Sequence, residues 1–247
     1  MKRLEGKTAL IVGAARGIAR AFPEAHVAES ARGALPGIDI AWARQSAEEM
    51  ATAAIVVEID GARQDFIGAS VAKTMAAPSG SGILIKNATI IVSAPIDEIA
   101  RDDCARVRDI NVAGTLFILQ AVAWHMMERG KSGSAMVVAS RTSRCGESVV
   151  AACCASNSAV SSLSQSAGLI LVQHRINVNA IAPGVVDGEH RDGVYAFIAK
   201  HEGSLFGRKK RDVGSSVSCG CAGRTGALAG RAVFLASDEA DCIVVRT

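Results

Sequence analysis

A glycine-rich turn is the first feature of this sequence whose residue types and spacing could do chemistry. The apolar run Thr8–Val12 leads directly into Gly13-Ala-Ala-Arg-Gly-Ile-Ala19. Glycines between a strand and a helix let backbone N–H groups and the positive end of the helix dipole approach a pyrophosphate closely. An ordinary strand-to-helix turn can show the same spacing, so the glycines alone leave both interpretations open.

An acidic residue farther along the chain supports the interpretation as a phosphate loop. Asp39 follows Gly17 by about 20 residues, the spacing at which an acid accepts hydrogen bonds from an adenosine ribose. A carboxylate at that place also disfavours a 2′-phosphate. The combination predicts a dinucleotide cofactor and favours NAD over NADP.

The other groups that could do chemistry are isolated. The chain has seven cysteines, but no Cys-x-x-Cys pair, and neither Cys153-Cys154 nor Cys219 with Cys221 has a usual zinc spacing. We therefore expect free thiols in a reducing compartment and no metal site. Tyr195 is the single tyrosine.

Charge and hydropathy exclude several classes of partner. A net charge of +3 is too small to imply nucleic acid or a membrane surface as a partner. The basic run at 208–211 could be a nucleic-acid patch, but a solvated helix face is the favoured interpretation. No run approaches the roughly 20 apolar residues of a membrane helix, and no plausible cleavage site follows the first apolar run. The expected location is the cytoplasm.

Apolar runs and helical spacing alternate along the chain and indicate how these residues are positioned. Beyond the first run, strand-like segments lie at 54–57, 83–85, 136–138 and 176–181. Between them, apolar residues from 112 to 126 recur at steps of three and four, as on one face of a helix. Such strands are buried on both faces, so the fold class is α/β, with one Rossmann-like, doubly wound parallel sheet in a single domain, 1–247.

Two prolines are expected to damage this architecture. Pro23 falls inside the first helix, where its ring and missing N–H cost about 3 kcal/mol. The second strand should lie near 33–39, where Gly33, Pro36 and Gly37 interrupt it.

In the correct order, several further motifs resemble those of the short-chain dehydrogenase/reductase family. After the glycine-rich turn come Glu58-Ile59, Lys86-Asn-Ala-Thr89, Ile110-Asn-Val112, Ala139-Ser140 and Asn179-Ala-Ile-Ala-Pro-Gly184. Within this family, the segments 114–117 and 176–190 look like those of bacterial sorbitol and galactitol dehydrogenases, which oxidise a polyol to a ketose with NAD.

The resemblance implies a role for each matching position. Asn111 and Ser140 would be catalytic, and Glu147 and His190 are expected near the substrate, under a lid at about 187–216. The expected cofactor-binding residues are Gly13, Arg16, Gly17, Ile18, Asp39, Glu58, Ile59, Asn87, Ala88, Pro183, Gly184 and Val186. The implied strand order is 3-2-1-4-5-6, and the implied assembly is a homodimer or homotetramer.

The residues that the family uses for proton transfer are replaced. The family's tyrosine and lysine, four residues apart on one helix, correspond to Cys153 and Asn157. A thiol is several ångströms shorter than a phenol, and misplacement by about 1 Å can cost on the order of a hundredfold in rate. Asn157 has no charge with which to lower the pKa of its neighbour.

Two further departures are expected to have physical consequences. Lys86 stands where the family has an asparagine, and a buried lysine without a carboxylate must lose its proton or find water. The chain reaches Thr247 where the family continues into a seventh strand, so we expect the sixth strand to have an open edge.

Three functional interpretations remain at this stage. One is a polyol dehydrogenase with some activity through Ser140, Asn111 and ordered water. Another is an NAD-binding protein without catalysis, which the replacements at Cys153 and Asn157 favour. The third, a chain with no stable function, follows from the two prolines and the missing strand.

Overall fold

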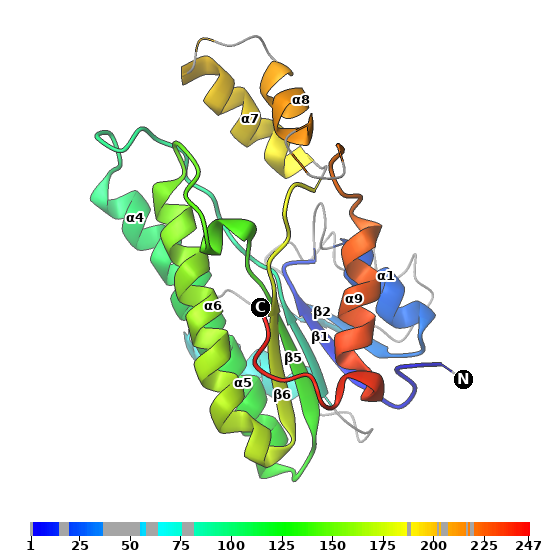
Figure 1. Cartoon of the computed structure of the whole chain (residues 1–247). Coiled ribbons are helices and arrows are strands. Elements are labelled where there is room, and N and C mark those ends of the chain that lie inside the picture. Colours follow the sequence, from blue (N-terminus) through cyan, green and yellow to red (C-terminus); the bar gives the residue numbers. More distant parts are fainter. Residues whose placement is uncertain are drawn as a thin grey trace.

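A parallel sheet with the strand order β3-β2-β1-β4-β5-β6 forms the centre of the computed structural model (Figure 1). The structure describes residues 2–14, 20–36, 55–57, 64–75, 82–186, 189–201, 203, 207–215, 217 and 220–247. The strands are β1 (Thr8–Val12), β2 (Arg32–Pro36), β3 (Ile55–Val57), β4 (Gly82–Lys86), β5 (Gly133–Val138) and β6 (Ile176–Ile181). The predicted fold class and strand order are confirmed.

Helices cover both faces of this sheet. Helices α1 (Ala21–Ala28) and α9 (Gly226–Ala236) lie on one face. On the other lie α3 (Gln64–Met75), α4 (Arg101–Arg108), a π-helix (Asp109–Ala113), α5 (Gly114–Glu128) and α6 (Ala151–Leu171). Helices α7 (Glu189–His201) and α8 (Arg208–Ser215) extend beyond the carboxyl edge of the sheet (Figure 1).

Alternating side chains of the central strands supply the two cores. In β1, Ala9 and Ile11 pack toward α1 and α9, whereas Leu10 and Val12 pack toward α3 and α5. All four are nearly inaccessible to solvent. A strand buried on both faces has little room for polar residues, which explains its continuous apolar sequence.

The long helical segment 101–128 is also a core element. By length and composition it would be apolar enough to cross a membrane. Its side chains Ile118, Leu119, Val122 and Met126 pack against the sheet, however, and are almost fully buried. This packing is that of a core helix in a globular domain.

Pro36 does not have the effect expected from the sequence, and the cost of Pro23 stays a prediction. Pro23 lies inside α1, as expected, and Arg20 before it is already helical, but residues 15–19 lie outside the described part of the chain. Pro36 is the last residue of β2 and pairs with Val57 of β3, whereas the pairing of β2 with β1 ends at Ala34. A proline at a strand end removes no bond from the centre of the sheet.

The expected open edge at β6 is wrong as well. The Val245 N–H donates to the Val178 carbonyl (3.1 Å), and the Ala180 N–H donates to the Arg246 carbonyl (2.7 Å). The buried Asn179 amide donates to the Ile243 carbonyl (2.7 Å), and its oxygen accepts the Arg246 N–H (3.0 Å). Residues 243–246 therefore cover this edge, although they are not assigned as a strand.

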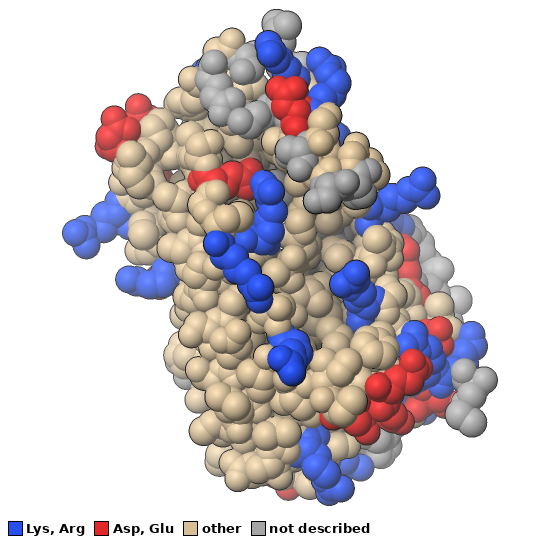
Figure 2. Space-filling model, viewed as in Figure 1, with Lys and Arg blue, Asp and Glu red and all other residues tan. Residues whose placement is uncertain are grey.

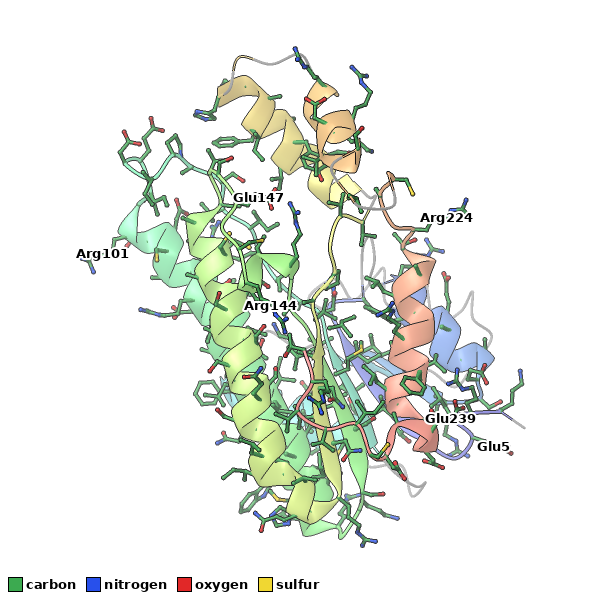
Figure 3. All side chains as sticks on the ribbon, in the orientation of Figure 1. Glu5, Arg101, Arg144, Glu147, Arg224 and Glu239 are labelled. Carbon is green, nitrogen blue, oxygen red and sulfur yellow. The ribbon has the colours of Figure 1, made fainter. Side chains whose placement is uncertain are left out.

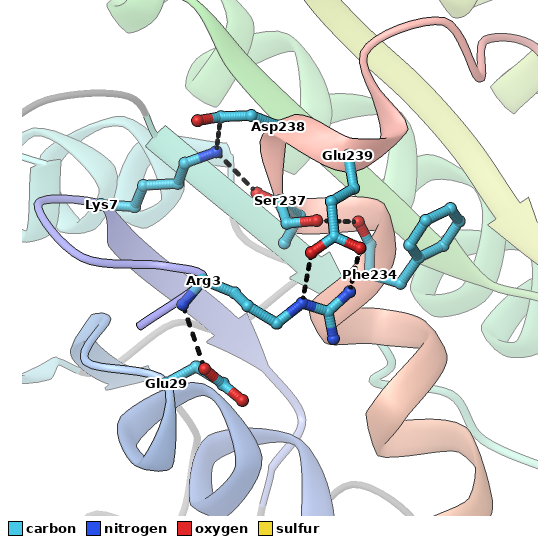
Figure 4. A network of polar contacts seen from close by, with 8 residues as sticks. Arg3, Lys7, Glu29, Phe234, Ser237, Asp238 and Glu239 are labelled. Carbon is cyan, nitrogen blue, oxygen red and sulfur yellow. Dashed lines mark hydrogen bonds and ion pairs between the residues drawn. The ribbon is translucent and has the colours of Figure 1, made fainter. Parts of the chain in front are cut away.

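A set of ion pairs connects the start of the chain to the end of α9 (Figure 4). The Arg3 guanidinium binds the Glu239 carboxylate at 2.7 and 3.0 Å, and Lys7 Nζ donates to the Ala236 carbonyl (2.9 Å) and to Asp238. The carboxylates are largely exposed, so these pairs contribute little to stability.

We predict that Asn179→Ala destabilises the protein by about 1 to 3 kcal/mol, because it removes two partly buried hydrogen bonds, one to the Ile243 carbonyl and one from the Arg246 N–H. Urea denaturation followed by circular dichroism measures the change. The matched control is Asn177→Ala, which removes one exposed bond to the Asp241 carbonyl. Equal destabilisation by the two variants would show that the segment 243–246 does not depend on Asn179.

Candidate functional site

The carboxyl ends of β1, β4, β5 and β6 meet at one edge of the sheet and bring most of the described candidate residues together. Gly13 follows β1, Asn87 and Ala88 follow β4, and Ser140 follows β5. Pro183 and Gly184 follow β6. In open α/β sheets, ligands bind at this edge.

Gly13 and Ala88 form the closest backbone approach at this edge. Gly13 has a φ of +83°, and a Cβ atom built on it would lie 2.5 Å from the Ala88 Cα atom. The N–H groups of Asn87 and Ala88 both donate to the Val12 carbonyl, at 3.0 and 3.1 Å. The Asn87 amide also donates to the Gly13 carbonyl (3.4 Å). Only glycine fits here, and the bare backbone suits a dinucleotide.

Part of the predicted cofactor set lies outside the described residues. This applies to Arg16, Gly17, Ile18, Asp39, Glu58 and Ile59. Val186 is described and pairs with Gly223 in an isolated bridge. His190 belongs to α7, but its side chain lies outside the described part.

Ser140 is held in a tight turn beside Pro183. Its hydroxyl oxygen accepts the Thr142 N–H (3.2 Å) and so caps the short 3-10 helix Arg141–Ser143. The Arg141 N–H donates to the Pro183 carbonyl (2.9 Å). The turn thus fixes Ser140 next to the Pro183-Gly184 segment. The capping role and the predicted catalytic role are compatible.

Asn111 connects three parts of the site. It lies in the π-helix Asp109–Ala113, the local widening that separates α4 from α5. Its side-chain oxygen accepts the Ile90 N–H (2.9 Å), and its amide donates to the Ile90 carbonyl (3.0 Å) and the Ser156 hydroxyl (3.1 Å). The Thr115 hydroxyl donates to the Asn111 carbonyl. Both polar groups of this side chain are therefore used.

Cys153 and Asn157 occupy the first two turns of α6 and contact each other. The Asn157 amide donates to the Cys153 carbonyl (3.0 Å) and lies 3.3 Å from the Thr142 hydroxyl and 3.5 Å from Cys153 Sγ. Burial raises the pKa of the Cys153 thiol to about 11, and the nearby Cys154 and Glu147 add to the increase. The thiol is therefore protonated near neutral pH.

Glu147 lies in the segment between the 3-10 helix Arg141–Ser143 and α6. In the view of Figure 3 it lies between the start of α6 and α7. Its carboxylate is 3.9 Å from the Arg141 guanidinium, and its side chain is only 15% exposed. Its electrostatic influence on Cys153 shows that the two side chains are near each other, and its role toward a substrate stays a prediction.

Lys86 is buried at the end of β4, only 2% exposed. Its Nζ donates to the Ala88 carbonyl. Burial lowers the pKa of the ammonium group to about 7. The lowered pKa agrees with the expectation that Lys86, if buried without a carboxylate, must lose its proton or find water.

Sequence reasoning did not identify Thr142 and Ser156, although both belong to this network. The Ser156 hydroxyl accepts a hydrogen bond from the Asn111 amide and donates one to the Cys153 carbonyl (2.8 Å). Its place three residues after Cys153 puts both on one helix face. In a helix so rich in serine, that spacing does not distinguish it from its neighbours.

We predict that the Cys153 thiol resists alkylation in the folded protein, because it is buried and protonated. Cys104, Cys145 and Cys242 are exposed and serve as internal controls. Iodoacetamide labelling at about pH 7.5 followed by mass spectrometry should modify these three first. Modification of Cys153 as fast as of Cys104 would contradict the burial of this thiol.

A second prediction concerns stability and pH. Between about pH 7 and 10.5 the unfolded chain protonates Lys86 and the folded chain does not, so the free energy of unfolding should rise with pH across this window. Lys86→Met should remove a few kcal/mol of this rise, whereas the control Lys131→Met, at an exposed lysine, should not. Parallel pH profiles in urea denaturation for the wild type and Lys86→Met would refute the burial of this charge.

Comparisons with known proteins agree with this geometry. The family model described as short chain dehydrogenase matches residues 7–197. The chain is 50% identical to a sorbitol dehydrogenase from Cereibacter sphaeroides and 44% identical to a galactitol 2-dehydrogenase from Agrobacterium fabrum, each over 99% of this chain and 96% of the relative. A crystal structure of gluconate 5-dehydrogenase from Burkholderia cenocepacia, in complex with NADP and tartrate, has a TM-score of 0.86 at 27% identity, covering 99% of this chain and 93% of that one. The chain belongs to the short-chain dehydrogenase family of nicotinamide-dependent oxidoreductases.

Proposed function

We propose that this protein binds NAD and a polyol of the sorbitol or galactitol type at the carboxyl edge of its sheet, and that its proton-transfer step is severely impaired. The identity to two polyol dehydrogenases over 99% of the chain supports the substrate class. The observation that carries the proposal is the buried Cys153–Asn157 pair, at the positions that the resemblance assigns to the family's tyrosine and lysine.

The described part of the cofactor site fits a dinucleotide. Gly13 and Ala88 give a turn without protruding side chains, and Asn87 offers an amide beside it. The preference for NAD over NADP rests on Asp39, whose carboxylate would meet a 2′-phosphate with like charge.

Oxidation of an alcohol requires a group that accepts the hydroxyl proton. A bound nicotinamide ring would accept the hydride from the carbinol carbon. Ser140 would hold the alcohol oxygen. Neither neighbour on α6 can serve as the base, because the Cys153 thiol keeps its proton near pH 7 and the Asn157 amide does not titrate.

A second candidate function is a polyol dehydrogenase that remains active without this pair. The retention of Ser140 and Asn111 in an ordered arrangement favours it. In that case an ordered water at the site would accept the proton.

Introducing the family's tyrosine and lysine at positions 153 and 157 distinguishes the two candidate functions. We predict that Cys153→Tyr with Asn157→Lys raises the rate of NADH formation from sorbitol or galactitol by about 10² to 10⁴, the usual contribution of a placed general base. The absorbance of NADH measures this rate. The matched control is Cys154→Tyr with Ser158→Lys, which places the same side chains four residues apart on the neighbouring stripe of α6.

The control should show no gain, and circular dichroism verifies that each variant is folded. A wild-type rate equal to that of the restored variant would support the second candidate and contradict the first. A folded, NADH-binding double variant with no activity would show that other elements of the site are also impaired.

We also propose that the protein is a cytoplasmic homo-oligomer. The six described cysteines are all free thiols, as expected in a reducing compartment. Figure 2 shows few charged side chains over α6. Apolar side chains on α5 and α6 and just after α6 are exposed: Leu116, Trp124, Leu169, Ile170 and Val172. Such a face is suited to a second copy of the chain.

A further inference from the structure

Lys86 is a buried amine at the carboxyl end of β4, next to Asn87 and Ala88 of the candidate dinucleotide site. In the sheet it pairs with Val12 of β1 on one side and Val137 of β5 on the other. Side chains alternate along a strand, so Lys86 shares the face of Leu84, beneath α5 and α6. Among the described residues, its hydrogen bond is to the Ala88 carbonyl.

The surroundings of Lys86 carry no described carboxylate that pairs with it. β1 and β5 have no titratable side chain, and α6 has only Cys153 and Cys154. The titratable groups of α5, His125 and Glu128, are in its last turn, beside Gly68, Val71 and Ala72 of α3. The remaining charged groups of the facing elements are on the π-helix, α4 and α3: Asp109, Arg101, Asp102, Asp103, Arg106, Arg108, Asp65 and Lys73.

On the π-helix, α4 and α3, the charged side chains that the structure describes are directed to solvent. Asp109 and Arg108 form an exposed pair (3.5 Å), and so do Asp103 and Arg106 (3.9 Å). Lys73 is exposed on α3. The lowered pKa of Lys86 is therefore caused by burial, and no described anion compensates it.

Lys86 contacts Ala88, the residue that lies against Gly13 at the start of the glycine-rich turn. The Ala88 carbonyl accepts a hydrogen bond from Lys86, and the Ala88 N–H donates to the Val12 carbonyl. The Cα atom of Ala88 lies against Gly13. The only described polar contact of the buried amine is therefore the Ala88 carbonyl. Ala88 follows Asn87, whose amide donates to the Gly13 carbonyl of the glycine-rich turn.

We propose that Lys86 is a positioning residue for the dinucleotide, which fixes the Ala88 carbonyl and places a proton-accepting amine behind the phosphate-binding turn, so that dinucleotide binding is coupled to proton uptake. This proposal rests on the proposed function, because it requires that the site bind a dinucleotide.

Elementary electrostatics gives the sign of the coupling. An anion near a buried ammonium group favours the charged form and raises its pKa. The free amine is half protonated near pH 7, so the bound state holds more protons than the free state at slightly alkaline pH. By linkage, affinity for the anionic ligand must then fall as pH rises.

The experiment uses ADP-ribose, which carries the pyrophosphate without the nicotinamide ring. Isothermal titration calorimetry from about pH 6 to pH 9, in two buffers of different ionisation enthalpy, measures affinity and proton uptake together. For the wild type we expect affinity to fall by about tenfold over this range, equivalent to a rise of about one pKa unit on binding. Lys131→Met, an exposed lysine far along the chain, should behave like the wild type.

Two variants of Lys86 separate its charge from its hydrogen bond. Lys86→Met should bind with little dependence on pH and little proton uptake. Lys86→Gln keeps an amide donor without a titratable group, so it should also be independent of pH and bind at least as tightly as Lys86→Met. A merely structural lysine would change affinity in both variants but leave the pH profile in place.

The outcomes are distinct. If Lys86→Met and Lys86→Gln bind ADP-ribose with the proton uptake and pH profile of the wild type, the proposal is overturned and the proposed function stands. If folded wild-type protein binds no ADP-ribose at any pH, the proposed function fails and the coupling fails with it.

Discussion

The close approach of the β1 and β4 ends is the contact on which the rest of the site depends. The Val12 carbonyl accepts two N–H groups from the segment after β4, and Gly13 lies so close to Ala88 that a Cβ atom would clash. This contact sets the spacing between the glycine-rich turn and the Asn87-Ala88 wall. Lys86, buried beneath α5 and α6, donates to the Ala88 carbonyl and so helps to fix this wall.

The second half of the site is a polar network organised around α6. Asn111 connects the segment after β4 to Ser156, and Ser156 and Asn157 both bind the Cys153 carbonyl. Asn157 also reaches Thr142, in the turn capped by Ser140. The network is well satisfied, yet it contains no group that titrates near neutral pH beside Ser140. The proposed function follows from this arrangement: an ordered site in which Cys153 and Asn157 stand where the resemblance places the proton-transfer pair.

Much of the fold could be predicted from the sequence, because apolar runs bounded by turns define buried parallel strands. The effect of Pro36 could not, since it depends on where β2 ends to within one or two residues. The covered β6 edge was missed because Asn179 and residues 243–246 are far apart in the chain. The positions of Ser140, Asn111 and Cys153 were predictable from ordered motifs. The contacts of Ser156 and Thr142 required the packing of α6 against two other segments.

The central claim is that the dinucleotide site is intact although the proton-transfer pair is replaced. A fluorescence titration with NADH tests it most directly, on protein that circular dichroism shows to be folded. Saturable enhancement of nicotinamide fluorescence, competed by ADP-ribose, is the predicted result. A folded chain that gives no saturable signal would contradict the account, because the Gly13–Ala88 contact would then hold the sheet together without forming a cofactor site.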